Sequence, residues 1–569
     1  ALEALGNIYF EKGEEEKALE YFEKLEQLVT DPDIKQRTLK AIAQIHEDIF
    51  NFLKAAQYIQ KILDINKNNK KYTHKLAKLY FKTEEWQKAI ETCQLYLKLT
   101  DDKLDQIEIL IILAQIYLEG FRDEQNALKY YKLTLEILPT YLPAIRAIVD
   151  IYKKNEKWKE IVNFYEDFLQ KHSQHLQEQK LPLMLDQAKI MKEQMGQPQK
   201  ALEIYQKVLE MDPNHITAHI ILAMLYSLQD NNKANAIKEH HFLISKSPFF
   251  AFSYHELYQL YIQSNDYDRA YLCCQILNAF EELFPEEKAF LKQLSPRIAS
   301  GWLDSSMLSN LVDKKFQDTF FKTMSYIDIY TEKIYPPEIE KYSVTREEVL
   351  DIYSGDPVCQ CISKIMQMLQ IEDLAVYFND KDKIFLENTQ PASLIIGKSL
   401  IKKLNQSQIY FVVARTLFYV ACKHIMAYKL NYQQYQDYVT SFVEAFAHTG
   451  KQITDTKETF SKRLKYAITK KVRKKLESRM DIMTSIYNTN SIAFQKSLES
   501  AANKCGLIIA EKFKPSYEAY FYLKNINKEE FYRNPKIKEL LQFYISDYHC
   551  KIRNEIGLSV KWLNKMKNF

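Results

Sequence analysis

The sequence Leu5-Gly6-Asn7-Ile8-Tyr9, followed nine residues later by Ala18, sets the pattern that decides the fold of the first half. The same order of apolar, small and large residues returns at Ile42–His46 with Ala55 and at Leu76–Tyr80 with Ala89. The pattern continues, and its later anchor positions are Ala127, Ile161, Ala201, Ala236 and Ala270. Successive anchors are 34 to 40 residues apart, so the chain contains eight units of one period.

Each unit has the pattern of two helices that pack against each other. A small residue such as Gly6 or Ala43 lets the second helix approach the first closely, and the large residue three positions later fills the space between neighbours. Prolines at positions such as Pro32 and Pro213 are expected to stop the second helix. A single unit cannot bury its apolar face alone, so stability must come from stacking.

Eight such units resemble tetratricopeptide repeats (TPRs). The resemblance implies an α-solenoid over residues 1–285 that holds a partner protein and transforms no substrate. The layout is also similar to large bacterial TPR proteins with a helical C-terminal domain, which implies architecture and no activity. Only ten glycines occur in 569 residues, and this scarcity independently favours a mainly α fold.

The residue after each small position is expected to line the concave groove of the solenoid. These residues are Asn7, Gln44, Lys78, Gln115, Asp150, Lys189, Met224 and Gln259. The set is polar and mixed in sign, which suits a peptide or a helix of another protein, whereas a phosphate backbone requires one sign. The alternative is that these positions are simply solvated. A carboxylate clamp of the kind found in chaperone-binding TPRs is not expected, because Ala41 stands where the second repeat needs Asn.

Bulk properties restrict the remaining possibilities. The length requires two or more domains, and the net charge of +4 does not indicate nucleic acid or a membrane as the main partner. The apolar runs are too short or too interrupted to span a bilayer. Eight cysteines without a CxxC pair favour reduced thiols in a cytoplasm. Residue 1 is Ala, which leaves room for a preceding segment with a targeting signal.

The repeat rhythm ends after Pro285, and two further regions follow. Residues 286–345 are predicted to be a helical connector, and residues 346–569 a mostly helical α+β domain with a small sheet. The segments 375–379 and 384–387 are expected to pair as a short hairpin around Asn379-Asp380, with a third strand at 393–396.

The segment Ser407–Val420 resembles the helix that carries HExxH in zinc metallopeptidases of the gluzincin type. Arg415 and Tyr419 stand at the two His positions and Thr416 at the Glu position. Arginine cannot ligate a cation, and threonine cannot act as the general base. The resemblance therefore implies a domain without metal, cofactor or catalysis. A peptidase that uses other ligands is the rival interpretation.

A second match lies at Glu499–Asn503, which resembles the E-x-x-A-D segment that supplies the third zinc ligand in gluzincins. Glu499 and Arg415 are therefore predicted to form an ion pair where the metal would lie. The alternative is that the two residues lie on unrelated helix surfaces.

The segment Thr459–Met480 is strongly basic, and its apolar residues recur every fourth position. Its central cations are Lys470, Lys471, Arg473, Lys474 and Lys475. A solvated helix face is the expected role, and docking to an acidic partner or anionic lipid is the alternative. Nucleic-acid binding through this helix is a third possibility, weaker than either.

Overall fold

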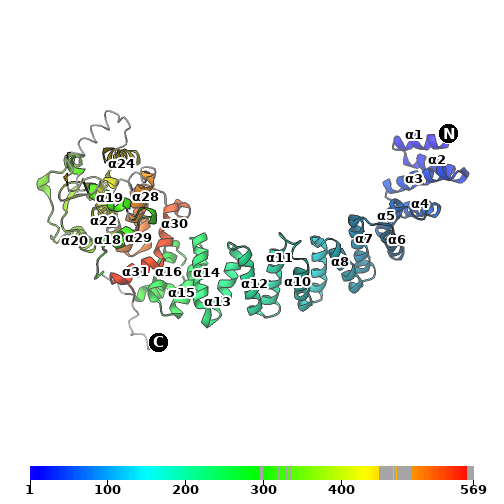
Figure 1. Cartoon of the computed structure of the whole chain (residues 1–569), viewed down its shortest axis with the longest axis horizontal. Helices are drawn as coiled ribbons and strands as arrows, with labels where there is room; N and C mark the ends of the chain where they lie inside the picture. Colours follow the sequence, from blue (N-terminus) through cyan, green and yellow to red (C-terminus); the bar gives the residue numbers. More distant parts are fainter. Residues whose placement is uncertain are drawn as a thin grey trace. The chain divides into compact units, whose positions relative to one another are not determined.

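The computed structural model describes residues 1–294, 299–317, 319–328, 331–333, 335–446 and 490–560, with the single positions 466, 469, 470 and 474. The chain forms two compact units, residues 1–222 and residues 223–569. Both consist mainly of helices (Figure 1). Within the described residues, no helix is both long enough and apolar enough to cross a membrane.

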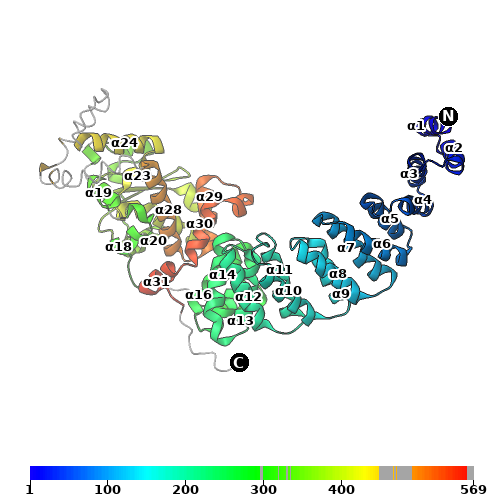
Figure 2. The same ribbon diagram turned by 45° about the vertical axis from the view of Figure 1, so that its right-hand side comes forward.

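Unit 1 is a succession of helix pairs, which follow one another along the chain in Figure 2. The first helices of the pairs are α1 (Leu2–Glu11), α3 (Pro32–Asp48), α5 (Lys70–Lys82), α7 (Lys103–Gln115), α9 (Leu142–Lys154) and α11 (Lys180–Glu193). The second helices are α2 (Glu15–Leu28), α4 (Phe52–Ile65), α6 (Trp86–Leu99), α8 (Glu124–Ile137), α10 (Trp158–His172) and α12 (Pro198–Met211). A π-helical turn, η1 (Ile116–Gly120), extends α7. The predicted solenoid of helix pairs is thereby confirmed.

The small positions of the repeat are small because a neighbouring helix lies against them. A Cβ atom on Gly6 would lie 2.8 Å from the ring of Phe22 in α2. The anchors Ala18, Ala89 and Ala201 are fully buried. Pro32 is the first residue of α3, where its fixed φ and missing N–H are tolerated, so it starts the next repeat more directly than it stops the preceding one.

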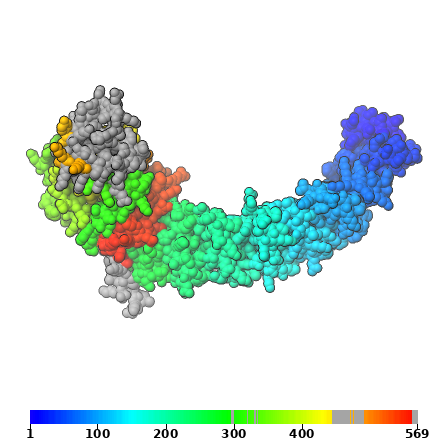
Figure 3. Space-filling model, in the orientation of Figure 1, coloured from blue at the N-terminus to red at the C-terminus, as the bar shows by residue number. Residues whose placement is uncertain are grey.

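Polar contacts show that like helices of successive pairs lie side by side. First helices are joined by Arg37–Glu3 (3.2 Å), Lys75–Glu47 (3.0 Å), Lys78–Glu108 (2.6 Å) and Lys153–Asp186 (3.5 Å). Second helices are joined by Lys61–Glu26 (2.7 Å) and Lys171–Glu136. Unit 1 therefore consists of a first-helix row and a second-helix row. In the space-filling view, residues 1–222 form a continuous band of atoms, coloured from blue toward green (Figure 3).

Unit 2 begins within α13 (Ile216–Ser227) and continues with the last helices that follow the repeat period. These helices are α14 (Lys233–Lys246), α15 (Ala251–Gln263) and α16 (Tyr267–Phe280). One hydrophobic core runs from Ile244 through Phe411 to Leu558, so α15 and α16 share their core with the C-terminal helices. The end of the repeat rhythm at 285 is thus not the boundary between the compact units.

The remaining helices of unit 2 surround this core. They are α17 (Pro285–Gln293), α18 (Ser305–Asn310), α19 (Thr319–Asp328), α20 (Pro357–Met368), α21 (Lys398–Lys403), α22 (Gln406–Ala421), α23 (Ile425–Lys429), α24 (Tyr432–Phe446), α28 (Ser491–Ala510), α29 (Phe513–Lys524), α30 (Pro535–Tyr544) and α31 (Asp547–Glu555). Short 3₁₀ turns are η2 (Asp230–Asn232), η3 (Lys314–Phe316), η4 (Thr331–Lys333), η5 (Ile339–Tyr342), η6 (Arg346–Glu348) and η7 (Lys528–Arg533).

The sheet of unit 2 has three strands in the order β1-β3-β2. The strands β1 (Ala375–Asn379), β2 (Ile384–Glu387) and β3 (Ser393–Gly397) lie where the sequence predicts them. The predicted hairpin of the first two strands is wrong, because β3 lies between them, parallel to β1 and antiparallel to β2. The physical reason is burial: all five residues of β3 are buried, and such a strand takes the central position. Gly397 is required there, since a Cβ would lie 1.7 Å from the carbonyl oxygen of Lys381.

Candidate functional site

The eight predicted groove residues, here called the groove stripe, are accessible to solvent. Asn7, Gln44, Asp150, Lys189, Met224 and Gln259 are exposed, and Lys78 and Gln115 are half-buried. The residue before each of them is buried. Six belong to the first helices of unit 1, and Met224 and Gln259 belong to α13 and α15 of unit 2. Their role in binding stays a prediction.

Stripe residues in unit 1 take part in the contacts that join neighbouring first helices. Gln44 accepts a hydrogen bond from Lys75 of the next first helix at 3.1 Å. Lys78 lies 2.6 Å from Glu108 of α7, and the same carboxylate lies 2.9 Å from Nε2 of His74. The stripe thus lies, at these positions, on a face formed jointly by successive repeats.

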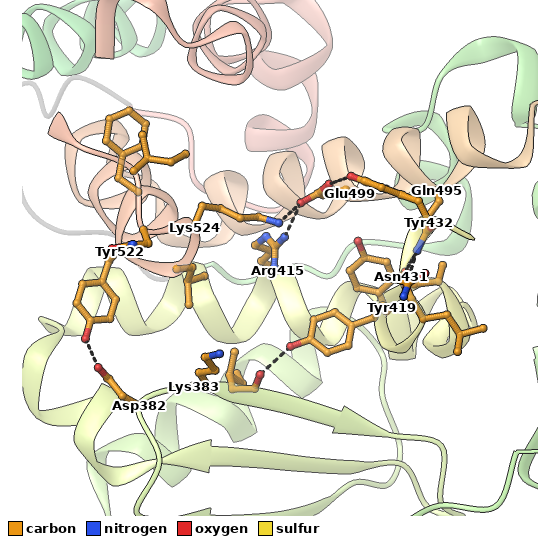
Figure 4. Close-up of a pocket in the computed structure, with 18 residues that line it drawn as sticks. Asp382, Lys383, Arg415, Tyr419, Asn431, Tyr432, Gln495, Glu499, Tyr522 and Lys524 are labelled. Atoms are coloured by element: carbon orange, nitrogen blue, oxygen red, sulfur yellow. Dashed lines mark hydrogen bonds and ion pairs between the residues drawn. The ribbon is translucent and has the colours of Figure 1, made fainter. Parts of the chain in front are cut away.

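Unit 2 contains a cavity of about 820 Å³, here called the Arg415 cavity (Figure 4). Its lining residues belong to α22, α23, α28 and α29, to the first residues of β2 and α24, and to the turns before β2, before α24 and after α29. Its lining residues are Asp382, Lys383, Ile384, Arg415, Tyr419, Ala427, Tyr428, Leu430, Asn431, Tyr432, Gln495, Glu499, Phe521, Tyr522, Leu523, Lys524, Asn525 and Ile526.

Arg415 and Glu499 form the predicted ion pair at one side of this cavity. Nη2 of Arg415 donates to Oε1 of Glu499 at 3.3 Å, and Nε donates to Oδ1 of Asn503 at 2.6 Å. The two charged side chains are only 8% and 16% exposed. The helices α22 and α28 approach closely here, and Gly506 permits this approach. A Cβ on Gly506 would lie only 2.9 Å from the carbonyl oxygen of Phe411. The alternative, that the pair lies on unrelated helix surfaces, is therefore wrong.

Glu499 is held by more partners than the sequence suggested. Nζ of Lys524 lies 2.5 Å from Oε1, and the hydroxyl of Tyr432 donates to Oε2 at 3.0 Å. Burial raises the pKa of Glu499, but the charges of Arg415 and Lys524 and the bond from Tyr432 outweigh it, so the pKa lies below its ordinary value. Both carboxylate oxygens are occupied, and the partners come from three separate helices. No motif in the sequence pointed to Lys524 or Tyr432.

Thr416 and Tyr419, the other two α22 residues of the metallopeptidase resemblance, have different surroundings. Thr416 is buried and donates to the carbonyl oxygen of Val412 at 2.9 Å, within its own helix. Tyr419 lines the cavity, and its hydroxyl forms no hydrogen bond with any residue that the structure describes. Burial raises the pKa of Tyr419 far above its ordinary value, so the hydroxyl keeps its proton at neutral pH.

Two further predictions concern metal ligands and the basic segment. Within the described ranges, no three His, Cys, Asp or Glu side chains come together as a metal-binding group. Of the predicted basic patch, the structure describes only Lys470 and Lys474, and both are exposed. Lys471, Arg473 and Lys475 lie outside the described residues, and the function of this basic patch stays a prediction.

The helix pairs of unit 1 contact one another closely at the small residues of the repeat. Family models described as tetratricopeptide repeat match residues 1–28 and 183–215, so the chain contains tetratricopeptide repeats. No curated protein matches the chain. The resemblance of the C-terminal domain to gluzincin metallopeptidases has no support from these matches.

Several solved structures are similar to part of the chain. A tetratricopeptide repeat protein from Parabacteroides merdae is 15% identical, with a TM-score of 0.25, and the match covers 46% of this chain and 97% of that one. The C-terminal part of a TPR protein from Cytophaga hutchinsonii is 15% identical, with a TM-score of 0.27, over 44% and 98%. The TPR2AB domain of yeast Sti1, in a complex with pHSP90, is 18% identical, with a TM-score of 0.22, over 46% and 97%.

Proposed function

We propose that this protein is a non-catalytic scaffold whose repeats hold a peptide segment or a helix of a partner protein along the groove stripe. The observation that carries the proposal is the placement of the stripe. Each of its eight side chains follows a buried residue on the first helix of a repeat, and each is accessible to solvent. A partner laid across successive first helices of unit 1 would meet the six stripe side chains of that unit in order.

The chemistry of the stripe favours a protein as the occupant. Its members offer amide donors and acceptors at Asn7 and Gln44, positive charge at Lys78 and Lys189, and negative charge at Asp150. This mixture matches a polypeptide with both signs of charge, whereas a nucleic-acid backbone is bound by one sign. Affinity would come from a few anchors and not from total buried area.

The non-catalytic part of the proposal rests on the Arg415 cavity. Arg415 and Tyr419 present N–H and O–H donors where a peptidase of the resembled type needs imidazole lone pairs. The proposal also places the protein in the cytoplasm, which is supported by eight cysteines that are all unbridged, seven of them buried.

The binding proposal is tested with charge reversals on the two rows of helices. The full chain is immobilised, and proteins retained from a lysate of the source cell are identified by mass spectrometry. We expect the double variant Lys78→Glu, Lys189→Glu on α5 and α11 to lose these proteins. The matched control is Lys98→Glu, Lys207→Glu on α6 and α12, where both lysines are exposed and form no ion pair with a described residue. Equal retention by both variants would show that the stripe is not the binding face.

The non-catalytic proposal has a separate test. Metal content is measured on full-length protein purified without chelator. We expect less than stoichiometric amounts of any transition metal. One zinc ion per chain, together with peptide hydrolysis that a chelator abolishes, would replace this proposal by the rival interpretation of a metal-dependent peptidase.

A further inference from the structure

Two donors that line the Arg415 cavity have no acceptor among the residues that the structure describes. Arg415 is 7% exposed and Tyr419 is 3% exposed, and both line the cavity from α22. Nε and Nη2 of Arg415 are bonded to Asn503 and Glu499, whereas Nη1 forms no hydrogen bond with the residues described by the structure. The same holds for the Tyr419 hydroxyl. Both atoms reach the solvent of the cavity, so water can bind them in the free protein, and a ligand that supplies an acceptor can take the place of that water.

The two donors act from the same face of the helix. Residues four apart in an α-helix are neighbours on one face, and positions 415 and 419 have this spacing. Burial keeps the Tyr419 phenol protonated through a raised pKa, and a guanidinium carries its proton at any physiological pH. The guanidinium can only donate hydrogen bonds, and the Tyr419 hydroxyl can donate one as well as accept. The pair is suited to an anion and not to a cation.

The charges around the cavity leave an excess of positive charge. Glu499 is shared by Arg415 and Lys524, and its second oxygen accepts from Tyr432. Asp382 is bound by Lys403 at 2.5 Å and by the hydroxyl of Tyr522 at 2.6 Å. Lys383 is exposed and forms no ion pair with a described residue. In Figure 4 it lies on the strand side of the cavity. Among the lining residues, two carboxylates thus face three cations, Lys383, Arg415 and Lys524.

The rest of the lining is largely apolar or aromatic. Tyr428, Leu430, Phe521, Leu523 and Ile526 present carbon surface to the cavity. The Tyr428 hydroxyl is occupied, because it donates to the carbonyl oxygen of Ile384 at 2.8 Å. A volume of about 820 Å³ lies within the range of sites that enclose small organic ligands or a few residues of a peptide.

We propose that the Arg415 cavity binds a monocarboxylate with an apolar or aromatic body. The carboxylate accepts hydrogen bonds from Nη1 of Arg415 and from the Tyr419 hydroxyl, and Lys383 neutralises its charge. The body lies against Tyr428 and Phe521. A phosphate fits less well, because its two charges require more free donors than one guanidinium nitrogen and one hydroxyl. The carboxylate belongs either to a free small acid or to the C-terminus of a peptide.

The first experiment measures binding of matched probes to the full chain by ligand-observed NMR titration. The probes are 3-phenylpropionate and its uncharged amide, and the peptide acetyl-Gly-Gly-Phe with a free or an amidated C-terminus. We expect each acid to bind at least about tenfold more tightly than its amide, because charge-assisted hydrogen bonds are lost in the amide. Tighter binding of the peptide acid identifies a C-terminus as the natural ligand, and tighter binding of 3-phenylpropionate identifies a free acid. Equal binding of acids and amides, or binding of neither, overturns the proposal.

The second experiment locates the bound acid with variants. Arg415→Met is expected to weaken the better acid at least about tenfold, and Tyr419→Phe and Lys383→Gln several-fold each. Tyr419→Phe keeps the buried ring and Lys383 is exposed, so these two variants report on binding even if Arg415→Met is unstable. Lys402→Gln, an exposed lysine of α21 outside the lining, is the control. Unchanged binding in Tyr419→Phe and Lys383→Gln overturns the proposal, as does equal weakening by Lys402→Gln.

Discussion

Two arginine–aspartate pairs join α16 to α31 within unit 2, and they differ mainly in burial. Arg553 donates through Nη2 and Nε to Asp268 at 2.9 Å and 3.2 Å, and the amide of Val560 donates to the same carboxylate at 2.9 Å. The side chains of Arg553 and Asp268 are 1% and 12% exposed. The second pair, Arg269–Asp547, has an N–O distance of 2.6 Å, and its side chains are 32% and 88% exposed. The two pairs form a natural comparison.

We predict that Asp268→Ala destabilises the attachment of α31 far more than Asp547→Ala. Removing one partner of a buried pair costs about 3–5 kcal/mol, because the other charge stays buried and unpaired. Asp268→Ala also removes the acceptor of the Val560 amide. An exposed ion pair contributes about 0–1 kcal/mol, since solvent screens it and its side chains lose entropy. The expected difference between the two variants is therefore at least about 2 kcal/mol.

Native-state hydrogen exchange of the amides in α31 measures this difference directly. The rate reports the free energy of local opening, and about 1.4 kcal/mol corresponds to a tenfold change. We expect Asp268→Ala to accelerate exchange in α31 by more than about 100-fold, and Asp547→Ala by less than about tenfold. Similar acceleration in the two variants would refute the reasoning that burial decides the strength of these pairs.

Three further predictions concern packing and pH. Ala89 is fully buried at a helix contact, so Ala89→Leu should lower the stability of unit 1 by about 1–3 kcal/mol in thermal denaturation followed by circular dichroism; an unchanged melting curve contradicts the repeat register. Burial lowers the pKa of His424 to about 3, so the unfolded chain takes up the proton first and stability falls as the pH drops below 6.5. His424→Phe should reduce the pH dependence of the unfolding free energy by about 1.4 kcal/mol per pH unit between roughly pH 6 and pH 4. The same pH dependence in the variant and the parent protein would show that His424 does not cause the loss of stability in acid. The pKa of Glu499 is lower in the folded protein than its ordinary value of 4.5. Ionised Glu499 therefore stabilises the fold at pH values above 4.5, and this stabilisation is lost as the pH falls through the pKa of the folded protein. Glu499→Gln should therefore unfold with less dependence on acid between roughly pH 5 and pH 3, and equal acid sensitivity of the two proteins argues against it.

The parts of the fold that were predicted correctly are those encoded by short-range patterns. Small residues at a fixed position of each repeat, such as Gly6 and Ala89, mark where helices touch, and the contact is made within one repeat. The three strands were also located, because apolar and β-branched residues between turn signals suffice to mark them. Their pairing was not, because the order β1-β3-β2 depends on which strand is most deeply buried in the finished domain.

The candidate site was also predicted only in part. The spacing of Arg415 within its helix, and the separate segment at Glu499, suggested that the two side chains meet, and they do. The further partners Tyr432 and Lys524 belong to helices that carry no recognisable motif. The cavity itself is a space between helices, and its existence could not be deduced from any single segment.

The sequence by itself determined the repeating helix pairs and the residue that each first helix leaves accessible after its buried neighbour. These properties follow from periods of a few residues, because the geometry of a helix converts sequence spacing directly into a face. Only the tertiary structure decided that the last repeat helices share a core with the C-terminal domain, and that three helices converge on Glu499 beside a cavity. The contacts of Glu499 with Arg415 and Tyr432 join residues more than 60 positions apart, and they depend on how whole elements pack, which no local pattern encodes.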